Sequence, residues 1–374
     1  MRVVDIPPVT RASTPCSTTS KVVDRERQGS DPAGGVTQQL NPLAALACGI
    51  LISESRMKIA RRTFLKCSGG AAATLAMPGS LIASGALMDK PIIDVHMHAY
   101  PAATPFGRPI VNPISGVKSP ISNGAEHMAA CIAEMKRCGI VKGIVSGGDG
   151  DRLKAAIAWH DRDPDRFVIG AGLRGSDEIP LPPVDVLRNL HAKGELQVLG
   201  ELTSQYAGLS LSDPKYEPYL ALAEELDMPV SLHTGTMPSA TTFDPCCISA
   251  RARFGNPELV EEALNRHPKL RLNLMHAGWP YLDDTMAILQ LYPNVCADTG
   301  ALNWLLPRAH FHRYLQTLVE AGFGDRIMFG SDHMYWPDGI GLAVEGIRSA
   351  AFLTEDQKRD IFYNNAVRFF KLAA

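Results

Sequence analysis

From residue 91 onward, short apolar segments alternate with longer amphipathic segments along the chain. The short segments are often β-branched, which is typical of strands covered on both faces. Strands that alternate with helices form a parallel sheet, and eight repeats close most naturally into a barrel. We therefore predict an α/β fold, a (β/α)8 TIM barrel, as a single domain over residues 89–374. Its eight strands are expected at residues 92–96, 141–146, 166–171, 197–201, 229–233, 270–275, 294–298 and 326–330.

The segments between these strands have helical periodicity, and some begin with a clear start signal. Asn256 followed by Pro257, for example, is typical of a helix amino terminus. A doubly wound open sheet is the alternative fold, but no glycine-rich phosphate loop follows the first strand. The proline-rich insert Ala99–Asn123 is expected to form a loop over the pocket. Helices are predicted at Ala125–Cys138, Asp151–Trp159, Pro218–Leu226, Pro257–Arg266, Phe311–Ala321 and Thr354–Phe370.

The first 88 residues differ from the rest in composition. Residues 1–56 are rich in Ser, Thr, Pro, Gly and charge without sustained periodicity, which predicts a disordered segment or a mis-called extension before Met57. Residues 57–88 resemble a twin-arginine export signal, with Arg61-Arg62 ahead of a long uncharged stretch and Ser84-Gly85-Ala86 as a cleavage site. We expect a periplasmic or exported protein that uses the twin-arginine export machinery, with no stable membrane insertion after cleavage. An uncleaved anchor is the alternative.

Charge and cysteine content exclude some classes of function. The net charge is −2, and no run of Lys and Arg stands out beyond the amino-terminal region, so no nucleic-acid partner is expected. Eight cysteines are present, but none of those after residue 88 has the Cys-x-x-Cys spacing of a zinc site. We therefore expect neither a disulfide scaffold nor a thiolate metal site, and we interpret Cys246-Cys247 as a loop with two small residues.

Groups that bind metals or move protons stand at the ends of five predicted strands. His96 and His98 end the first strand, and residues two apart on a strand point to the same side. The carboxyl ends of barrel strands form the active-site face, so these groups are expected to meet. The later strands end in Glu201, His233, His276 and Asp332.

This donor set predicts a divalent metal site, with the number of ions, one or two, left open. Imidazole and carboxylate suit Zn²⁺ best, with Mn²⁺ or Fe²⁺ as alternatives. His96, His98 and His233 would supply three neutral ligands, and Asp332 a fourth ligand or a base. His276 is placed to polarise a substrate oxygen or accept a proton. Two roles are left open for Glu201: a contact with the metal, and a salt bridge inside the barrel mouth.

Four motifs together resemble the amidohydrolase superfamily. They are Val95-His96-Met97-His98, Leu232-His233-Thr234-Gly235, Met275-His276-Ala277-Gly278 and Phe329-Gly330-Ser331-Asp332. The pattern is similar to the amidohydrolase 2 branch, which includes aminocarboxymuconate-semialdehyde decarboxylase and related lactonases, and it covers residues 92 to 370. The resemblance implies a distorted (β/α)8 barrel with a divalent metal at its mouth. It also implies His96, His98, His233 and Asp332 as ligands, with His276 assisting and Glu201 as a bridge if two metals bind.

Three functions follow from these observations. The first is a metal-dependent hydrolase that uses a metal-activated water on a C–O or C–N bond of a small-molecule lactone, ester or amide. The second is a non-oxidative decarboxylase of an aromatic or unsaturated acid, and the third is a catalytically silent periplasmic binding protein. Arg174 is a candidate partner for a substrate carboxylate. Trp279, Trp304 and Trp336 either line an apolar pocket or pack ordinarily. A homo-oligomer is left open.

Overall fold

A computed structural model of the chain describes residues 90–106, 110–146, 151–177 and 179–373. The predicted extension at 1–56 and the predicted export signal at 57–88 lie outside the described residues. Within these described ranges, the helices are too short or too polar to cross a membrane.

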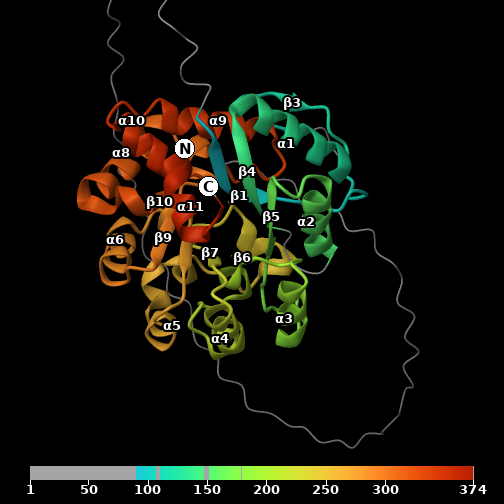
Figure 1. The fold of residues 1–374 in the computed structure, drawn as a ribbon, viewed down its shortest axis with the longest axis vertical. Coiled ribbons are helices and arrows are strands. Elements are labelled where there is room, and N and C mark those ends of the chain that lie inside the picture. Colours follow the sequence, from blue (N-terminus) through green and yellow to red (C-terminus); the bar gives the residue numbers. More distant parts are fainter. Residues whose placement is uncertain (1–89, 107–109, 147–150, 178, 374) are drawn as a thin grey trace, which may run out of the picture. The chain divides into compact units, whose positions relative to one another are not determined.

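Eight parallel strands form one sheet in the order in which they occur along the chain (Figure 1). The first and last strands meet through two backbone hydrogen bonds, from the N–H of Val95 to the carbonyl of Phe329 and from the N–H of Asp332 to the carbonyl of His96. The helices surround the strands, so the predicted TIM barrel is confirmed. The strands are β1 (Ile92–His98), β4 (Ile140–Ser146), β5 (Phe167–Ala171), β6 (Val198–Leu202), β7 (Val230–His233), β8 (Leu272–Met275), β9 (Val295–Asp298) and β10 (Ile327–Met328).

The helices follow the predicted positions but are more often interrupted. The predicted helix Thr354–Phe370 is two helices joined by a wide turn at Asp360–Asn364, and Pro257–Val260 forms a 3₁₀ turn ahead of its helix. The helices are α1 (Gly124–Cys138), α2 (Asp151–Arg162), α3 (Val184–Ala192), α4 (Glu217–Glu225), α5 (Glu261–Arg266), α6 (Leu282–Leu291), α7 (Leu302–Leu305), α8 (Arg308–Leu318), α9 (Asp338–Arg348), α10 (Glu355–Arg359) and α11 (Asn365–Phe370).

Two apolar clusters hold the barrel together. The larger one packs the strands against the surrounding helices. The smaller one gathers strand residues from β1, β4, β6 and β10 around Phe369 and Phe370 of α11. Because these strands lie on different sides of the barrel, this cluster fills part of its interior.

An irregularity in β1 turns its histidines toward the barrel mouth. Val95 belongs to the interior cluster, whereas Met97 packs in the outer one. The pairing of β1 with β4 shifts register between Asp94 and Met97. A bulge re-aims the side chains that follow it, so His96 and His98 both face the mouth above the interior core.

Part of the insert between β1 and α1 packs against the segment after β10. It contains a two-stranded hairpin of β2 (Ile110–Val111) and β3 (Lys118–Ser119). Tyr100 stacks on Tyr335 with 4.9 Å between ring centroids, and the indole N–H of Trp336 donates to the carbonyl of Val111. These contacts hold the insert beside the end of the last strand. Its influence on substrate choice stays a prediction.

Candidate active site

Five of the six predicted side chains face one another at the carboxyl ends of their strands. Nε2 of His98 lies 2.8 Å from Oδ1 of Asp332 and 3.7 Å from Oε2 of Glu201. Nε2 of His96 lies 3.7 Å and 3.9 Å from the same two oxygens. Oε1 of Glu201 is 3.7 Å from Nε2 of His276. We call His96, His98, Glu201, His276 and Asp332 the strand-end centre.

Three imidazoles are fixed through Nδ1, so that Nε2 is the atom presented to the site. Nδ1 of His96 lies 3.3 Å from Oδ1 of Asp298, and Nδ1 of His276 lies 3.0 Å from the carbonyl of Gly300. Nδ1 of His233 lies 2.9 Å from Oε1 of Gln205, whose amide N–H donates to a backbone carbonyl. Because all three partners are acceptors, each Nδ1 carries the proton. A lone pair on Nε2 is then available for a metal ion.

His233 is beside the strand-end centre and is not one of its members. Its ring centroid is 4.7 Å from that of His276, and its Nε2 is 3.4 Å from the hydroxyl of Tyr206. Among the described residues, the two donor groups around His96 that could hold an ion do not include it. Its role as a metal ligand stays a prediction.

Glu201 is oriented toward the histidines. Its backbone N–H donates to the hydroxyl of Ser146 at 2.8 Å. One carboxylate oxygen faces His96 and His98, and the other faces His276. The carboxylate therefore reaches both sides of the strand-end centre, and this position is compatible with a metal contact as well as with a salt bridge.

The electrostatic environment of the centre favours a positive charge among these side chains. Burial acts to lower the pKa of His96, but the carboxylates of Asp332, Asp298 and Glu201 outweigh it and raise the pKa to about 10. Burial acts in the opposite sense on Glu201 and Asp332, and the surrounding histidines hold the pKa of both carboxyls below the usual range. Two carboxylates and several imidazoles around one point are a natural place for a cation.

The donor atoms fit a divalent ion. Nε2 of His96 is buried without a hydrogen-bond partner, and Oδ1 of Asp332 is buried with no aligned hydrogen bond. Leaving such atoms unpaired costs about 1–3 kcal/mol each. Histidine nitrogen and carboxylate oxygen are the donors that zinc, manganese and iron accept in open catalytic sites.

Asp298 is a functional residue that the sequence analysis missed. It ends β9 and accepts hydrogen bonds from the amide of Asn273, from the backbone of His276 and Gly300, and from Nδ1 of His96. Its position could have pointed to it, because Asp298 ends the predicted strand 294–298, as Glu201 ends another. No local pattern indicated that Asp298 would lie under the histidines.

Asp298→Asn is expected to weaken metal binding about 10- to 100-fold. The amide keeps the shape of the carboxylate but removes the charge that orients His96 and raises its basicity. Competition with a chromogenic chelator measures the metal affinity. The exposed Asp325→Asn is the matched control. Equal affinities in both variants, with thermal unfolding unchanged, would rule out this positioning role.

Two of the three tryptophans that were considered for lining a pocket are core residues. Trp304 and Trp336 are buried, lie against each other edge to face, and donate their indole N–H groups to backbone carbonyls. Trp279 is half-buried, and its N–H points to His310. Ordinary packing therefore accounts for Trp304 and Trp336.

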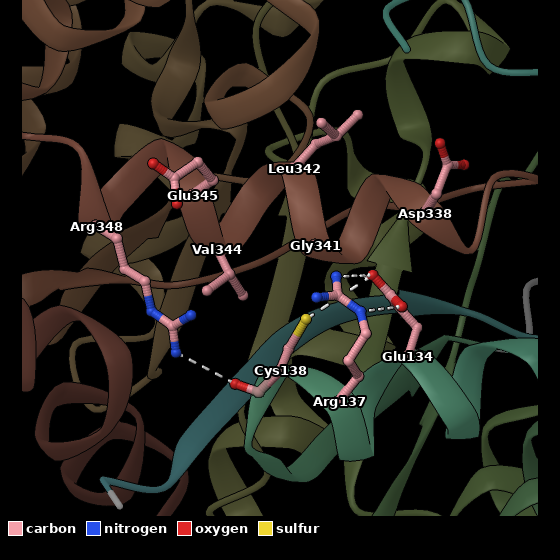
Figure 2. A pocket seen from close by; sticks show the side chains of 9 residues that line it. All are labelled: Glu134, Arg137, Cys138, Asp338, Gly341, Leu342, Val344, Glu345 and Arg348. Carbon is pink, nitrogen blue, oxygen red and sulfur yellow. Dashed lines mark hydrogen bonds and ion pairs between the residues drawn. The ribbon is translucent and has the colours of Figure 1, made fainter. Parts of the chain in front are cut away.

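A surface pocket of about 360 Å³ lies between α1 and α9, at a distance from the strand ends (Figure 2). Its charged groups are already paired in part, with Arg137 donating to both carboxylate oxygens of Glu134. Arg348 points to the backbone carbonyl of Cys138. The pocket lacks the donor set of the strand-end centre and is not a candidate for the chemistry.

Several solved structures share the fold. An uncharacterized TIM-barrel protein from Bordetella bronchiseptica is 16% identical, with a TM-score of 0.56 over 75% of this chain and 98% of the other. A probable 2-pyrone-4,6-dicarboxylic acid hydrolase from Acinetobacter baumannii, with citric acid bound, is 15% identical, with a TM-score of 0.52 over 75% and 99%. A 5-carboxyvanillate decarboxylase from Novosphingobium aromaticivorans, with bound manganese and a nitrobenzoic acid, is 16% identical, with a TM-score of 0.51 over 77% and 99%.

Comparison of sequences gives the family. Protein fluG of Emericella nidulans is 21% identical over 132 residues, which are 31% of this chain and only 15% of that protein. The family model described as amidohydrolase (Amidohydro_2) matches residues 93–372, which is the whole barrel. The chain therefore belongs to the amidohydrolase 2 family of enzymes.

Proposed function

We propose that this protein is a metal-dependent hydrolase that cleaves a C–O or C–N bond in a small organic substrate such as a lactone, ester or amide. The observation that carries this proposal is the strand-end centre, where His96 Nε2 lies buried and unpartnered beside two carboxylates. We propose Zn²⁺ as the ion, with Mn²⁺ or Fe²⁺ as outcomes of metal analysis.

His96, His98 and Asp332 would hold the ion, with His233 and Glu201 as further ligands. When bound, a divalent ion lowers the pKa of a coordinated water toward about 7 and acts as a Lewis acid. Asp332 would then accept a proton and pass it to the leaving group. Burial acts to lower the pKa of His276, but Glu201 and Asp332 raise it above its ordinary value. His276 would polarise a substrate oxygen or accept a proton.

Arg174 makes a carboxylate-bearing substrate the favoured class. It follows β5, at the end of the barrel where the centre lies, and its guanidinium is 5.3 Å from the ring centroid of Tyr206. Tyr206 in turn contacts His233.

Arg174 also lies 3.6 Å from the sulfur of Cys247, which forms a disulfide with Cys246. The interpretation of Cys246-Cys247 as a loop with two small residues did not include this link.

Arg174→Gln is expected to raise KM for a carboxylate substrate about 10- to 100-fold and to leave kcat nearly unchanged. A hydrogen bond to a charged group contributes about 1.5–3 kcal/mol, and glutamine cannot supply the charge. Steady-state kinetics on acid and methyl-ester forms of one substrate measure the effect. Arg188→Gln, at a surface ion pair with Glu225, is the control. A kcat loss with unchanged KM would argue against carboxylate binding.

A decarboxylase of an aromatic or unsaturated acid is the second candidate. The pairing of Arg174 with the aromatic ring of Tyr206 also suits a planar aromatic acid. The Novosphingobium structural neighbour is a decarboxylase that holds manganese and a nitrobenzoic acid, which supports this alternative about as well as the Acinetobacter neighbour supports hydrolysis.

Turnover in ¹⁸O-labelled water separates the two candidates. Hydrolysis places one labelled oxygen in the product and releases no carbon dioxide. Decarboxylation releases carbon dioxide and leaves the organic product unlabelled. A screen of lactones, esters, amides and aromatic acids with this readout supports the hydrolase proposal if label enters the product. Release of carbon dioxide alone would replace it by the decarboxylase.

We also propose export by the twin-arginine machinery, on the basis of Arg61-Arg62 and the uncharged stretch that follows them. Sequencing the amino terminus of the exported protein is expected to find a start near Leu87. A start within residues 1–56 would refute cleavage at Ser84-Gly85-Ala86.

A further inference from the structure

A second group of potential metal ligands lies apart from the strand-end centre. His127 and Cys131 lie on α1, and His333 follows Asp332 in the chain. Their ligand atoms can all lie within 4.8 Å of one another, and all three side chains are fully buried. We call these three residues the α1 cluster.

The two α1 residues are four positions apart, so they lie on the same face of the helix. Sγ of Cys131 is 3.6 Å from Nε2 of His127 and 3.8 Å from Nδ1 of His333. The same two nitrogens lie 2.8 Å and 3.1 Å from the backbone carbonyl oxygen of Met334. One sulfur, two imidazole nitrogens and one carbonyl oxygen thus surround a single buried point.

The two sulfur–nitrogen separations are close to those of a tetrahedral metal site. Bond lengths of about 2.3 Å to sulfur and about 2.0 Å to nitrogen place ligand atoms about 3.3–3.6 Å apart around a tetrahedral ion. The measured separations from sulfur are 3.6 Å and 3.8 Å. Little side-chain movement is therefore needed to close the α1 cluster around an ion.

The hydrogen bonds within the α1 cluster are few. The other ring nitrogen of His333, Nε2, is buried and has no hydrogen-bond partner. Both imidazoles share one carbonyl oxygen, and the thiol is a weak donor at distances above 3.5 Å.

We propose that His127, Cys131 and His333 bind a second metal ion, of the zinc class that thiolate and imidazole select, with the carbonyl oxygen of Met334 as fourth donor. Binding releases the thiol proton of Cys131 to solvent, and the two histidines bind as neutral ligands. The ion would tie α1 to the segment after β10 and so support Asp332, which immediately precedes His333. This proposal departs from the expectation, drawn from cysteine spacing, that the barrel has no thiolate metal site.

Cobalt substitution tests the proposal without reference to turnover. The strand-end centre contains no sulfur, so a thiolate-to-cobalt charge-transfer band can arise only at a cysteine. The full-length protein loaded with Co²⁺ is expected to show this near-ultraviolet band at about one equivalent per chain. Cys131→Ala is expected to lose the band and one equivalent of cobalt. Alanine suits this position because a buried cysteine packs as a small hydrophobic residue.

Cys138→Ala provides the matched control, since Cys138 is also buried on α1 but lies outside the cluster. It is expected to keep the band. His127→Phe is a second variant that leaves the thiol in place and is expected to shift or abolish the band. No band in the cobalt-saturated wild-type protein would overturn the proposal. A band that persists in Cys131→Ala would assign it to another cysteine and overturn it equally.

Discussion

Replacing His96 by alanine is expected to remove one equivalent of metal from the protein and to abolish turnover. His96 is fully buried, its Nδ1 is held by Asp298, and its Nε2 faces Asp332 and Glu201 without a hydrogen-bond partner. Removal of His96 takes away one of the donor atoms that would hold the ion, and alanine offers no replacement, so the ion is held far more weakly. Elemental analysis and an activity assay on the same sample measure both effects.

The control for His96→Ala is His310→Ala, which removes an exposed imidazole near Trp279. It is expected to keep its metal and its activity. Full activity in His96→Ala would refute the assignment of His96 as a ligand. Loss of activity with the metal retained would move His96 to a role in substrate binding.

Asp332→Asn is expected to lower kcat about 10²- to 10⁴-fold, the range for removal of a positioned acid–base group, and to leave KM nearly unchanged. The amide keeps the size of the side chain but cannot accept a proton at neutral pH. Asp332 is buried, and His96 and His98 hold the pKa of its carboxyl below the usual range, so it is ionised and ready to accept. Steady-state kinetics measure the loss.

Asp356→Asn, an exposed change in the first turn of α10, is the control and is expected to leave kcat unchanged. An unaffected rate in Asp332→Asn would give Asp332 a structural role, such as anchoring the segment after β10 through its N–H bond to the carbonyl of His96. A raised KM with kcat unchanged would indicate substrate contact instead of proton transfer.

The barrel could be predicted because its signal is repeated and local. Eight buried strands, each followed by a helix, leave little choice of topology once the sheet is parallel. The same topology predicted that groups at strand ends would converge, and Glu201, His276 and Asp332 do face His96. The order of the strands alone was therefore enough to predict where these groups would meet.

The details that position the site depend on geometry that no local pattern encodes. The register shift that turns His96 toward the mouth involves a neighbouring strand. His276 and Asp332 have φ values of 60° and 44°, in a region that residues other than glycine rarely adopt and that is not visible in their identities. The α1 cluster joins a helix near the start of the barrel to a loop about 200 residues later, so its spacing resembles no known motif.

Metal binding at the strand-end centre can be tested by diffraction from crystals grown with added Zn²⁺ or Mn²⁺. The data are measured on both sides of the metal's absorption edge. Anomalous difference density then locates each ion independently of activity and separates the strand-end centre from the α1 cluster. We expect a peak about 2.0–2.2 Å from Nε2 of His96 and from an oxygen of Asp332. Crystals without a peak among His96, His98 and Asp332, even at saturating metal, would contradict this expectation.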